Sequence, residues 1–297
     1  MEAVAKGIDH VAVLVADLDK SARHYERLGF NLAPRGHHPQ YGTANHTMMF
    51  GSDYLELITV EQLRSSNYLI AERLESHEGL WLLALASEDL ADAALVLDDR
   101  QVSHGGVQQY SRETSDACGS PAPARFATIH LGYHDYPGAT VALCQHHTRE
   151  LVWKPGLADH PNGTVGIAEL TLVAKDPAAV AQCYQPILGQ PFRNSATDFS
   201  YVLGRQTIRV TTHELLRNRI GIDAPHSLPE TALAHVALET TELKLVRDCL
   251  AQAGVAACES PVGSLIADAA LTSGTIIEFR EHVPSDRRHR SRQVLAG

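Results

Sequence analysis

The sequence predicts an α+β fold made of four copies of one unit, in which a strand and a helix are followed by three further strands. Residues 8–30 combine a short apolar strand, a turn and an amphipathic helix. This pattern returns three times along the 297 residues. Short segments with period-two alternation follow each copy, as expected for half-buried strands. Internal repetition of this kind indicates the architecture of the whole chain, whereas a single motif describes only one segment of it.

The copies align residue by residue. At an offset of 159 residues from IDHVAVLVADLDKSARHYERLGF, the chain reads IAELTLVAKDPAAVAQCYQPILG, which places Asp176 on Asp17. At an offset of 225 residues, LAHVALETTELKLVRDCLAQAGV places His235 on His10. A weaker copy, LWLLALASEDLADAALVL, places Asp89 on Asp17. Two histidines therefore occupy one position of the repeat, on its first strand, where a side chain can be held rigidly.

Each copy is expected to contribute its elements in the same order. In the first copy, Gly29 ends the helix and Gly51 lies in a hairpin turn between the last two strands. The expected strands are 8–15, 31–34, 45–50 and 54–59, then 80–87, 107–110, 124–131 and 140–145, then 166–174, 191–194, 200–203 and 207–212, then 232–239, 256–259, 264–269 and 275–280. The expected helices are 18–28, 90–98, 177–188 and 243–253, with a connecting helix at 66–75 and irregular segments at 113–123 and 222–229.

Four units predict two domains of two units each, which suits a chain of this length. We expect an N-terminal domain over residues 1–147 and a C-terminal domain over 165–282. The linker expected between them, 148–164, carries two prolines and an Asn-Gly pair. Residues 283–297 contain four arginines and are expected to form a flexible basic tail.

Composition excludes several classes of protein. The net charge of -10 argues against nucleic acid as a partner, because phosphate binding requires a basic face. The sequence contains no apolar segment long enough for a transmembrane helix and no signal peptide at its start, so no membrane association is expected. Five scattered cysteines without a CxxC motif suit a reducing compartment. A cytoplasmic protein is the expectation.

Several segments resemble the vicinal oxygen chelate superfamily, and its glyoxalase-like branch in particular. They are IDHVAVLVADL, RGHHPQYGTANHTMMFG, DYLELI and the segment CQHHTRELVWKPGLADHPNGTVGIAEL between the halves. The resemblance covers about residues 7–282. It implies four βαβββ modules, paired into two open, cup-shaped, mostly antiparallel sheets with helices outside. It does not fix the reaction, because this superfamily includes isomerases, dioxygenases, transferases and plain binding proteins.

Alternation in the strand YLELI predicts a polar group inside the first cup. If Leu55 and Leu57 face the helices, Tyr54 and Glu56 face the cup. A carboxylate buried there without a partner is costly, so a metal ion, an arginine or exposure to the cup is required. The resemblance favours a metal, because His10 and Glu56 match the superfamily's ligand positions on the first and last strands of a module. Imidazole with carboxylate suits zinc, iron, manganese or nickel.

The third metal ligand depends on the strand VALCQHH. The matching first-strand position of the second module is Leu82, which cannot bind a metal. In one register, Cys144 and His146 face the cup, and His10, Glu56 and His146 complete a set of two histidines and one carboxylate. In the register shifted by one residue, Gln145 takes that place.

The C-terminal half offers a second candidate set. His235 begins the fourth module, Glu278 lies on its last strand, and Glu169 stands where the third module would carry its first-strand histidine. Extradiol dioxygenases, by resemblance, use two histidines and a glutamate at these positions, and the set here has one histidine and two carboxylates. Glu278 could instead pair with an arginine such as Arg280 or Arg209.

Other polar residues suggest catalytic roles. His130 and His46 are candidates for a general acid-base, and Arg35 for binding an anionic substrate. The sequence contains no GxSxG, P-loop or GxGxxG motif after a strand. We therefore expect a metal-dependent isomerase or lyase whose small-molecule substrate chelates the ion through two adjacent oxygens. An iron(II) ring-cleaving dioxygenase and a non-catalytic binding protein are the alternatives. A homodimer is compatible with the superfamily but is not needed to build a cup from four fused modules.

Overall fold

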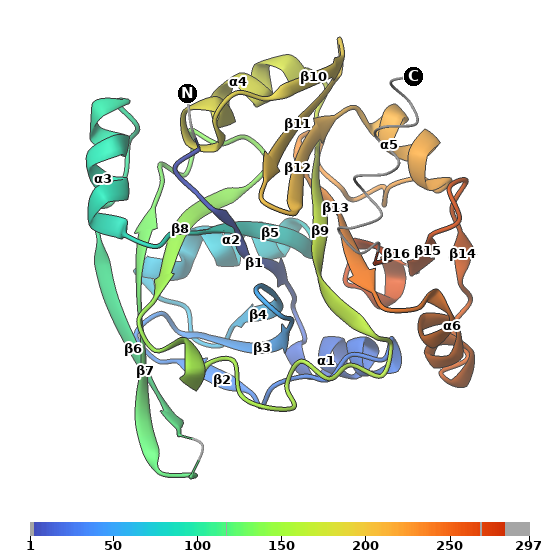
Figure 1. The fold of residues 1–297 in the computed structure, drawn as a ribbon, viewed down its shortest axis with the longest axis horizontal. Helices are drawn as coiled ribbons and strands as arrows, with labels where there is room; N and C mark the ends of the chain where they lie inside the picture. The colour runs from blue at the N-terminus through green and yellow to red at the C-terminus, as the bar shows by residue number, and fades with distance from the viewer. Residues whose placement is uncertain (1–2, 117, 268, 283–297) are drawn as a thin grey trace, which may run out of the picture.

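The computed structural model describes residues 3–116, 118–267 and 269–282, which form two curved eight-stranded sheets (Figure 1). The first sheet contains β1 (Gly7–Leu14), β2 (Gly36–His38), β3 (Thr43–Met49), β4 (Tyr54–Val60), β5 (Gly79–Ala86), β6 (Gln108–Ser115), β7 (Pro121–His130) and β8 (Thr140–His146). The second contains β9 (Thr164–Val173), β10 (Phe192–Ser195), β11 (Asp198–Leu203), β12 (Gln206–Thr211), β13 (Ala232–Thr240), β14 (Cys258–Glu259), β15 (Leu265–Ala267) and β16 (Ile276–Glu281). The basic tail expected at 283–297 lies outside the described residues.

Both sheets share one pattern of strand pairing. Their orders are β2-β3-β4-β1-β5-β8-β7-β6 and β10-β11-β12-β9-β13-β16-β15-β14. In the first sheet, β1 is parallel to β4 and antiparallel to β5, and β5 is parallel to β8. In the second, β9 and β13 take the corresponding places beside β12 and β16. Each sheet thus joins two βαβββ modules through their first strands, and the predicted fold class is confirmed.

Four helices follow the first strands of the modules: α1 (Leu18–Arg27), α3 (Leu90–Asp99), α4 (Pro177–Leu188) and α6 (Leu243–Gln252). The aspartate that the repeat places before three of them is an N-cap. The side chains of Asp17, Asp89 and Asp176 accept hydrogen bonds from backbone N–H groups of the first turn, which otherwise lack partners. No helix among the described residues is long and apolar enough to cross a membrane.

Two further α-helices connect the two modules of each half. The expected helix at 66–75 is present as α2 (Tyr68–Ser76), preceded by a short 3-10 helix at Ser65–Asn67. A second connecting helix, α5 (His213–Ile220), follows β12 and was not expected from the sequence. Its signals are local: Thr212 caps the N-terminus through its side-chain oxygen, and Gly221 ends the helix at a φ of 80° in the left-handed region.

Two segments differ from the expected strands, one in the first module and one in the second. Residues 113–123, expected to be irregular, largely continue β6 and β7 as a hairpin. Asp116 holds its turn, because its Oδ1 accepts hydrogen bonds from the backbone N–H of Cys118 and of Ser120. The strand expected at 31–34 is irregular instead, and β2 forms at Gly36–His38.

One continuous core joins the two sheets. Its main buried cluster includes residues from β1 and β4 as well as from β9 and β13. The rings of Phe30 and Phe279 stack with centroids 5.9 Å apart, and the Tyr25 hydroxyl donates a hydrogen bond to the Thr272 carbonyl. The strand β9 already begins at Thr164, the last residue of the expected linker. The domain boundaries at 148–164 stay a prediction, since packing is continuous across this segment.

Candidate functional site

The polar site of the first cup begins with an irregularity in β1. Along the antiparallel pair of β1 and β5, Ile8 pairs with Leu85 and His10 pairs with Ala84, so Asp9 is an extra residue in the ladder. Such a bulge re-aims a side chain that regular alternation would send to the opposite face. Asp9 and His10 therefore both contribute to the cup. Sequence reasoning missed Asp9, because strict alternation places it among the helices.

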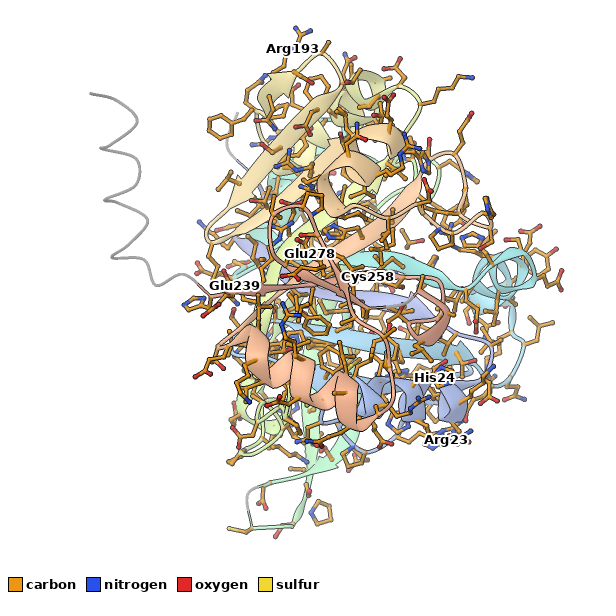
Figure 2. All side chains as sticks on the ribbon, turned by 90° about the vertical axis from the view of Figure 1, so that its right-hand side faces the viewer. Arg23, His24, Arg193, Glu239, Cys258 and Glu278 are labelled. Carbon is orange, nitrogen blue, oxygen red and sulfur yellow. The ribbon has the colours of Figure 1, made fainter. Side chains whose placement is uncertain are left out.

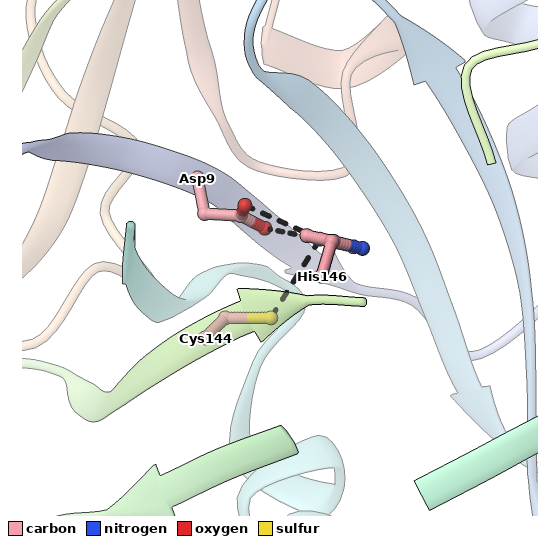
Figure 3. A group of neighbouring side chains, drawn as sticks. All are labelled: Asp9, Cys144 and His146. Atoms are coloured by element: carbon pink, nitrogen blue, oxygen red, sulfur yellow. Dashed lines mark hydrogen bonds and ion pairs between the residues drawn. The ribbon is translucent and has the colours of Figure 1, made fainter. Parts of the chain in front are cut away.

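Asp9 links two histidines from different modules. Its carboxylate lies 2.6 Å from His10 Nδ1 and 3.2 Å from His146 Nε2. The thiol of Cys144 lies 3.7 Å from the same His146 nitrogen, and Figure 3 shows these side chains converging from β1 and β8. Asp9, Cys144 and His146 can offer three ligand atoms within reach of one ion.

Glu56 lies on the other side of His10. Its Oε2 is 3.7 Å from His10 Nε2, and its Oε1 accepts a hydrogen bond of 2.6 Å from Asn45 on β3. The ring of Tyr54 stacks on that of His10, with centroids 4.4 Å apart and an interplanar angle of 14°. The two nitrogens of His10 thus face two different carboxylates, and the imidazole has a fixed orientation. The alternation predicted for β4 is confirmed, since Leu55 and Leu57 belong to the core.

The protonation of this cluster follows from its ion pairs. Burial alone would raise the pKa of Asp9, but hydrogen bonds from His10 and His146 outweigh it and hold this pKa well below its usual range. Burial lowers the pKa of His10, but the Asp9 carboxylate and, more weakly, Glu56 outweigh it and raise this pKa above its ordinary value. Burial raises the pKa of the Cys144 thiol, so this thiol is neutral.

The register of β8 decides between Gln145 and His146. Gln145 points to the helix side, where its Nε2 donates to the Glu88 carbonyl and its Oε1 accepts from Leu90 N at the start of α3. His146 consequently lies on the cup face, where Trp153 packs edge-on against it with ring centroids 5.0 Å apart. The Nδ1 atom of His146 is buried and has no partner among the described residues.

These residues fit a divalent cation on two observations. Asp9 and Glu56 are 2% and 6% exposed, and within the described part of the chain neither forms an ion pair with a lysine or arginine. Histidine is their only ionic partner there, so the cup can hold more positive charge than the side chains supply. The unpartnered Nδ1 of His146 supplies a further donor atom. Imidazole with carboxylate is a donor set that zinc, iron and related ions accept.

The two histidines expected to act as acid-base catalysts do not join this cluster. His46 lies on the face of β3 opposite to Asn45, and its Nδ1 contacts the Ala33 carbonyl at 2.8 Å. This position corrects the catalytic expectation for His46, because the whole sheet separates its ring from the cup. His130 is exposed on β7, three strands from β1 in the sheet order and hence roughly 14 Å away along the sheet.

Arg35, expected to bind an anionic substrate, is instead paired on the protein surface. Its guanidinium donates to Asp19 at 2.8 Å and to Glu61 at 2.7 Å. It does border a cavity of about 700 Å³ at the mouth of the first cup, which β2, β3, β6 and residues 151–157 enclose. Because its charge is matched by two carboxylates, Arg35 offers little attraction to a further anion.

The second candidate set of the C-terminal cup converges, but its members are matched by arginines (Figure 2 labels Glu278). His235 is fully buried, with Nδ1 3.0 Å from Thr171 Oγ1 and Nε2 2.9 Å from Glu278. Burial lowers the pKa of His235, which favours the neutral ring. Glu278 also receives 2.6 Å and 2.5 Å hydrogen bonds from Arg280 and Ser264.

Glu169 is surrounded by three guanidinium groups. Arg219 lies 2.5 Å away, and Arg209 and Arg280 lie 3.4 Å away. Burial raises the pKa of Glu169, but the three arginines outweigh it and lower this pKa to about 2. In the C-terminal cup, arginines therefore pair directly with the buried carboxylates, whereas Asp9 and Glu56 pair with no lysine or arginine in the described part of the chain. The pairing of Glu278 with Arg280, one of the alternatives raised by the sequence, is confirmed.

Comparison with known proteins agrees with this architecture. The family model of the glyoxalase-like domain matches residues 8–188, from β1 to the end of α4. The chain belongs to the glyoxalase-like domain family. The resemblance to the vicinal oxygen chelate superfamily is thereby confirmed. A search of curated proteins finds no match to this glyoxalase-like chain.

Solved structures share the fold at low sequence identity. A hypothetical protein from Staphylococcus aureus is 12% identical, with a TM-score of 0.66 over 93% of this chain and 99% of that one. A mutant of 4-hydroxymandelate synthase from Streptomyces coelicolor is 12% identical, with a TM-score of 0.62 over 93% of this chain and 92% of that one. A fusion of a xylose isomerase-like TIM barrel with 4-hydroxyphenylpyruvate dioxygenase is 13% identical, with a TM-score of 0.56 over 99% of this chain and 52% of that one. At these identities the likeness concerns the fold alone.

Proposed function

We propose that the N-terminal cup is the metal site of a glyoxalase-like isomerase or lyase, whose substrate is a small molecule with two adjacent oxygens. His10, Glu56 and His146 are the proposed ligands, and Asp9 is the carboxylate that holds the two histidines. A divalent metal bound there would supply a Lewis acid that stabilises negative charge on a substrate oxygen. Zinc, iron, manganese and nickel all suit this donor set.

The observation that carries this proposal is the difference in charge between the two cups. Glu169 and Glu278 of the C-terminal cup have arginine partners at 2.5 Å and 2.6 Å. Asp9 and Glu56 of the N-terminal cup form no ion pair with a lysine or arginine among the described residues, and their ionic partners are histidines. A buried carboxylate without a cationic partner is unfavourable. A divalent ion supplies that charge in the first cup, as guanidinium groups do in the second.

The chain's own residues prepare this site. Asp9 contacts His10 Nδ1 and thereby leaves Nε2 directed towards Glu56. Asn45 donates to one oxygen of Glu56 and leaves the other towards His10. Carboxylates and amides that fix metal-binding side chains in this way raise affinity and define geometry. Tyr54 stacks on His10 and Trp153 packs edge-on against His146, so an aromatic ring covers each imidazole.

An iron(II) dioxygenase is the second candidate. The proposed ligands are two histidines and one carboxylate, the set that oxygen-activating non-haem iron sites use with open coordination positions. Oxygen consumption by the iron-loaded protein with a catechol would distinguish this reaction from isomerisation or lysis, which consume no oxygen. A binding protein without metal is the third reading, and the metal measurement below decides it.

The test is metal content, measured by elemental analysis on untagged protein purified without chelator. We expect about one iron, manganese, nickel or zinc ion per chain, because only the first cup holds buried carboxylates without a lysine or arginine partner among the described residues. His10→Ala, Glu56→Gln and His146→Ala should each lose most of the bound metal while circular dichroism stays native-like. His24→Ala is the matched control, because His24 is a histidine on α1 (Figure 2) outside the cluster.

Two outcomes would contradict the proposal. Native protein that binds no metal, even after reconstitution with each ion in turn, would favour the binding-protein reading. Metal that is retained in the three N-terminal variants but lost in His235→Ala would move the site to the C-terminal cup.

A further inference from the structure

The cavity at the mouth of the first cup contains two cations that no carboxylate of the described chain neutralises. It has a volume of about 700 Å³ and is bordered by Gly36, Asn45, Arg112, Thr114 and Lys154 among others. Through Asn45 it adjoins the proposed metal site, because the same side chain donates to Glu56. A ligand in the cavity therefore lies next to the cluster.

Arg112 reaches across the mouth of the cup. It lies on the edge strand β6 opposite Ala124, a fully buried residue on the cup face of β7. A Cβ atom added to Gly36, on the other edge strand, would lie 3.4 Å from Arg112 Nη1 and would collide with Asn45 Oδ1. Because glycine has no side chain, Gly36 leaves room for the Arg112 guanidinium and the Asn45 amide. Arg112 is half-buried and forms no ion pair with any described residue.

Lys154 is the second cation. Its Nζ donates to the hydroxyls of Thr114 at 2.8 Å and Ser115 at 3.3 Å, and within the described chain it contacts no carboxylate. An ammonium group has three donors, so one N–H of Lys154 stays available. Glu113 also borders the cavity but is exposed and pairs with neither cation.

We infer that this cavity binds an organic carboxylate, with its carboxylate group held by Arg112 and Lys154 and the rest of the molecule directed past Asn45. The direction towards the metal ligands rests on the proposed function; the carboxylate site itself does not. A guanidinium and an ammonium suit a single carboxylate. Phosphate sites usually add a helix N-terminus or a nest of backbone N–H groups, and no α-helix among the described residues begins at this cavity.

The experiment compares an acid with its uncharged methyl ester. They are 3,4-dihydroxybenzoate, which has two adjacent oxygens and a remote carboxylate, and its methyl ester, which lacks the charge. Binding is measured by isothermal titration calorimetry up to millimolar concentration, on metal-loaded and on metal-stripped protein. We expect the acid to bind about tenfold or more tightly than the ester, as the loss of a charge-assisted hydrogen bond predicts.

The variants isolate the two cations. Arg112→Met and Lys154→Met should each weaken binding of the acid about tenfold and leave the ester unchanged, and Arg112→Lys should restore part of the loss. Arg193→Met is the control with the same change in charge, because Arg193 is exposed on β10 in the C-terminal sheet (Figure 2). Unchanged ester binding identifies variants that have kept their fold.

Failure of this inference is separable from failure of the proposed function. Equal binding of acid and ester, no binding of the acid, or acid binding that Arg112→Met and Lys154→Met do not change would overturn the carboxylate site, whatever the metal content. A preference for the acid that depends on both cations in a chain that binds no metal would support the carboxylate site and contradict the metal proposal.

Discussion

At the scale of single residues, strand alternation placed Glu56 in the cup and missed Asp9. The pattern YLELI placed Glu56 in the cup, and the repeat identified His10. Asp9 was missed because a bulge breaks the two-residue period, and no sequence pattern encodes that bulge. The equivalent bulge in β13 falls between Leu233 and His235, where Ala234 stands. The first cup therefore carries a carboxylate that the C-terminal cup lacks at the same position.

Asp9 has a testable role as the residue that positions both histidines. Asp9→Asn keeps the size of the side chain but removes its negative charge. We expect metal affinity to fall about ten- to hundredfold, the usual effect of losing a carboxylate that holds a metal-binding histidine. Metal titration with a competing chelator measures the change. Asp92→Asn, on an exposed aspartate of α3, is the control; an affinity equal to that of native protein in Asp9→Asn would exclude the positioning role.

At the scale of elements, periodicity predicted the four module helices and most of the strands, although the strand expected at 31–34 forms at Gly36–His38 instead. Tertiary contacts decided what periodicity left open. The register of β8 could not be derived from VALCQHH, because both faces carry a usable donor. The contact of Gln145 with the start of α3 sets this register. The short helix α5 was missed because eight residues with few apolar positions show no clear helical period, although the residues that cap both ends are recognisable in the sequence.

The arginine cluster predicts how the C-terminal cup responds to acid. Glu169 on β9 joins Arg209 of β12, Arg219 of α5 and Arg280 of β16. Its pKa is lowered from 4.5 to about 2, so as the pH falls, the carboxyl group of Glu169 is protonated in the unfolded chain at a higher pH than in the folded chain. The stabilisation is therefore complete above about pH 4.5 and is lost as the pH falls towards 2.

Glu169→Gln tests this pairing. The variant leaves three arginines short of one partner, and we expect the free energy of unfolding near neutral pH to fall by about 3 kcal/mol. The decline in stability between about pH 4.5 and 2 should also become shallower, because the amide that replaces the carboxyl group does not titrate. Urea unfolding at a series of pH values measures both effects, with Glu72→Gln on α2 as the control. Parallel acid profiles in native and Glu169→Gln proteins would rule out the assigned pKa.

At the scale of the whole molecule, the repeat predicted two similar halves but not how closely they are joined. Asp53, in the turn between β3 and β4, is fully buried and accepts hydrogen bonds from Ile167 N, Arg205 and Gln206 of the other half. Contacts of this kind depend on residues far apart in the sequence, so no local pattern indicates them. They extend the continuous core, and we therefore expect the stability of each cup to depend on the other.

This continuity predicts a single unfolding transition. Both tryptophans, Trp81 and Trp153, lie in the N-terminal sheet or the segment that packs on it, whereas the strands and helices of both halves contribute to circular dichroism. Tryptophan fluorescence and far-ultraviolet circular dichroism should therefore report the same urea midpoint. Asp53→Ala, which removes a buried partner of Arg205, should lower both midpoints together. Two separate transitions in the native chain would show that the halves fold independently, and the first cup could then be studied as an isolated domain.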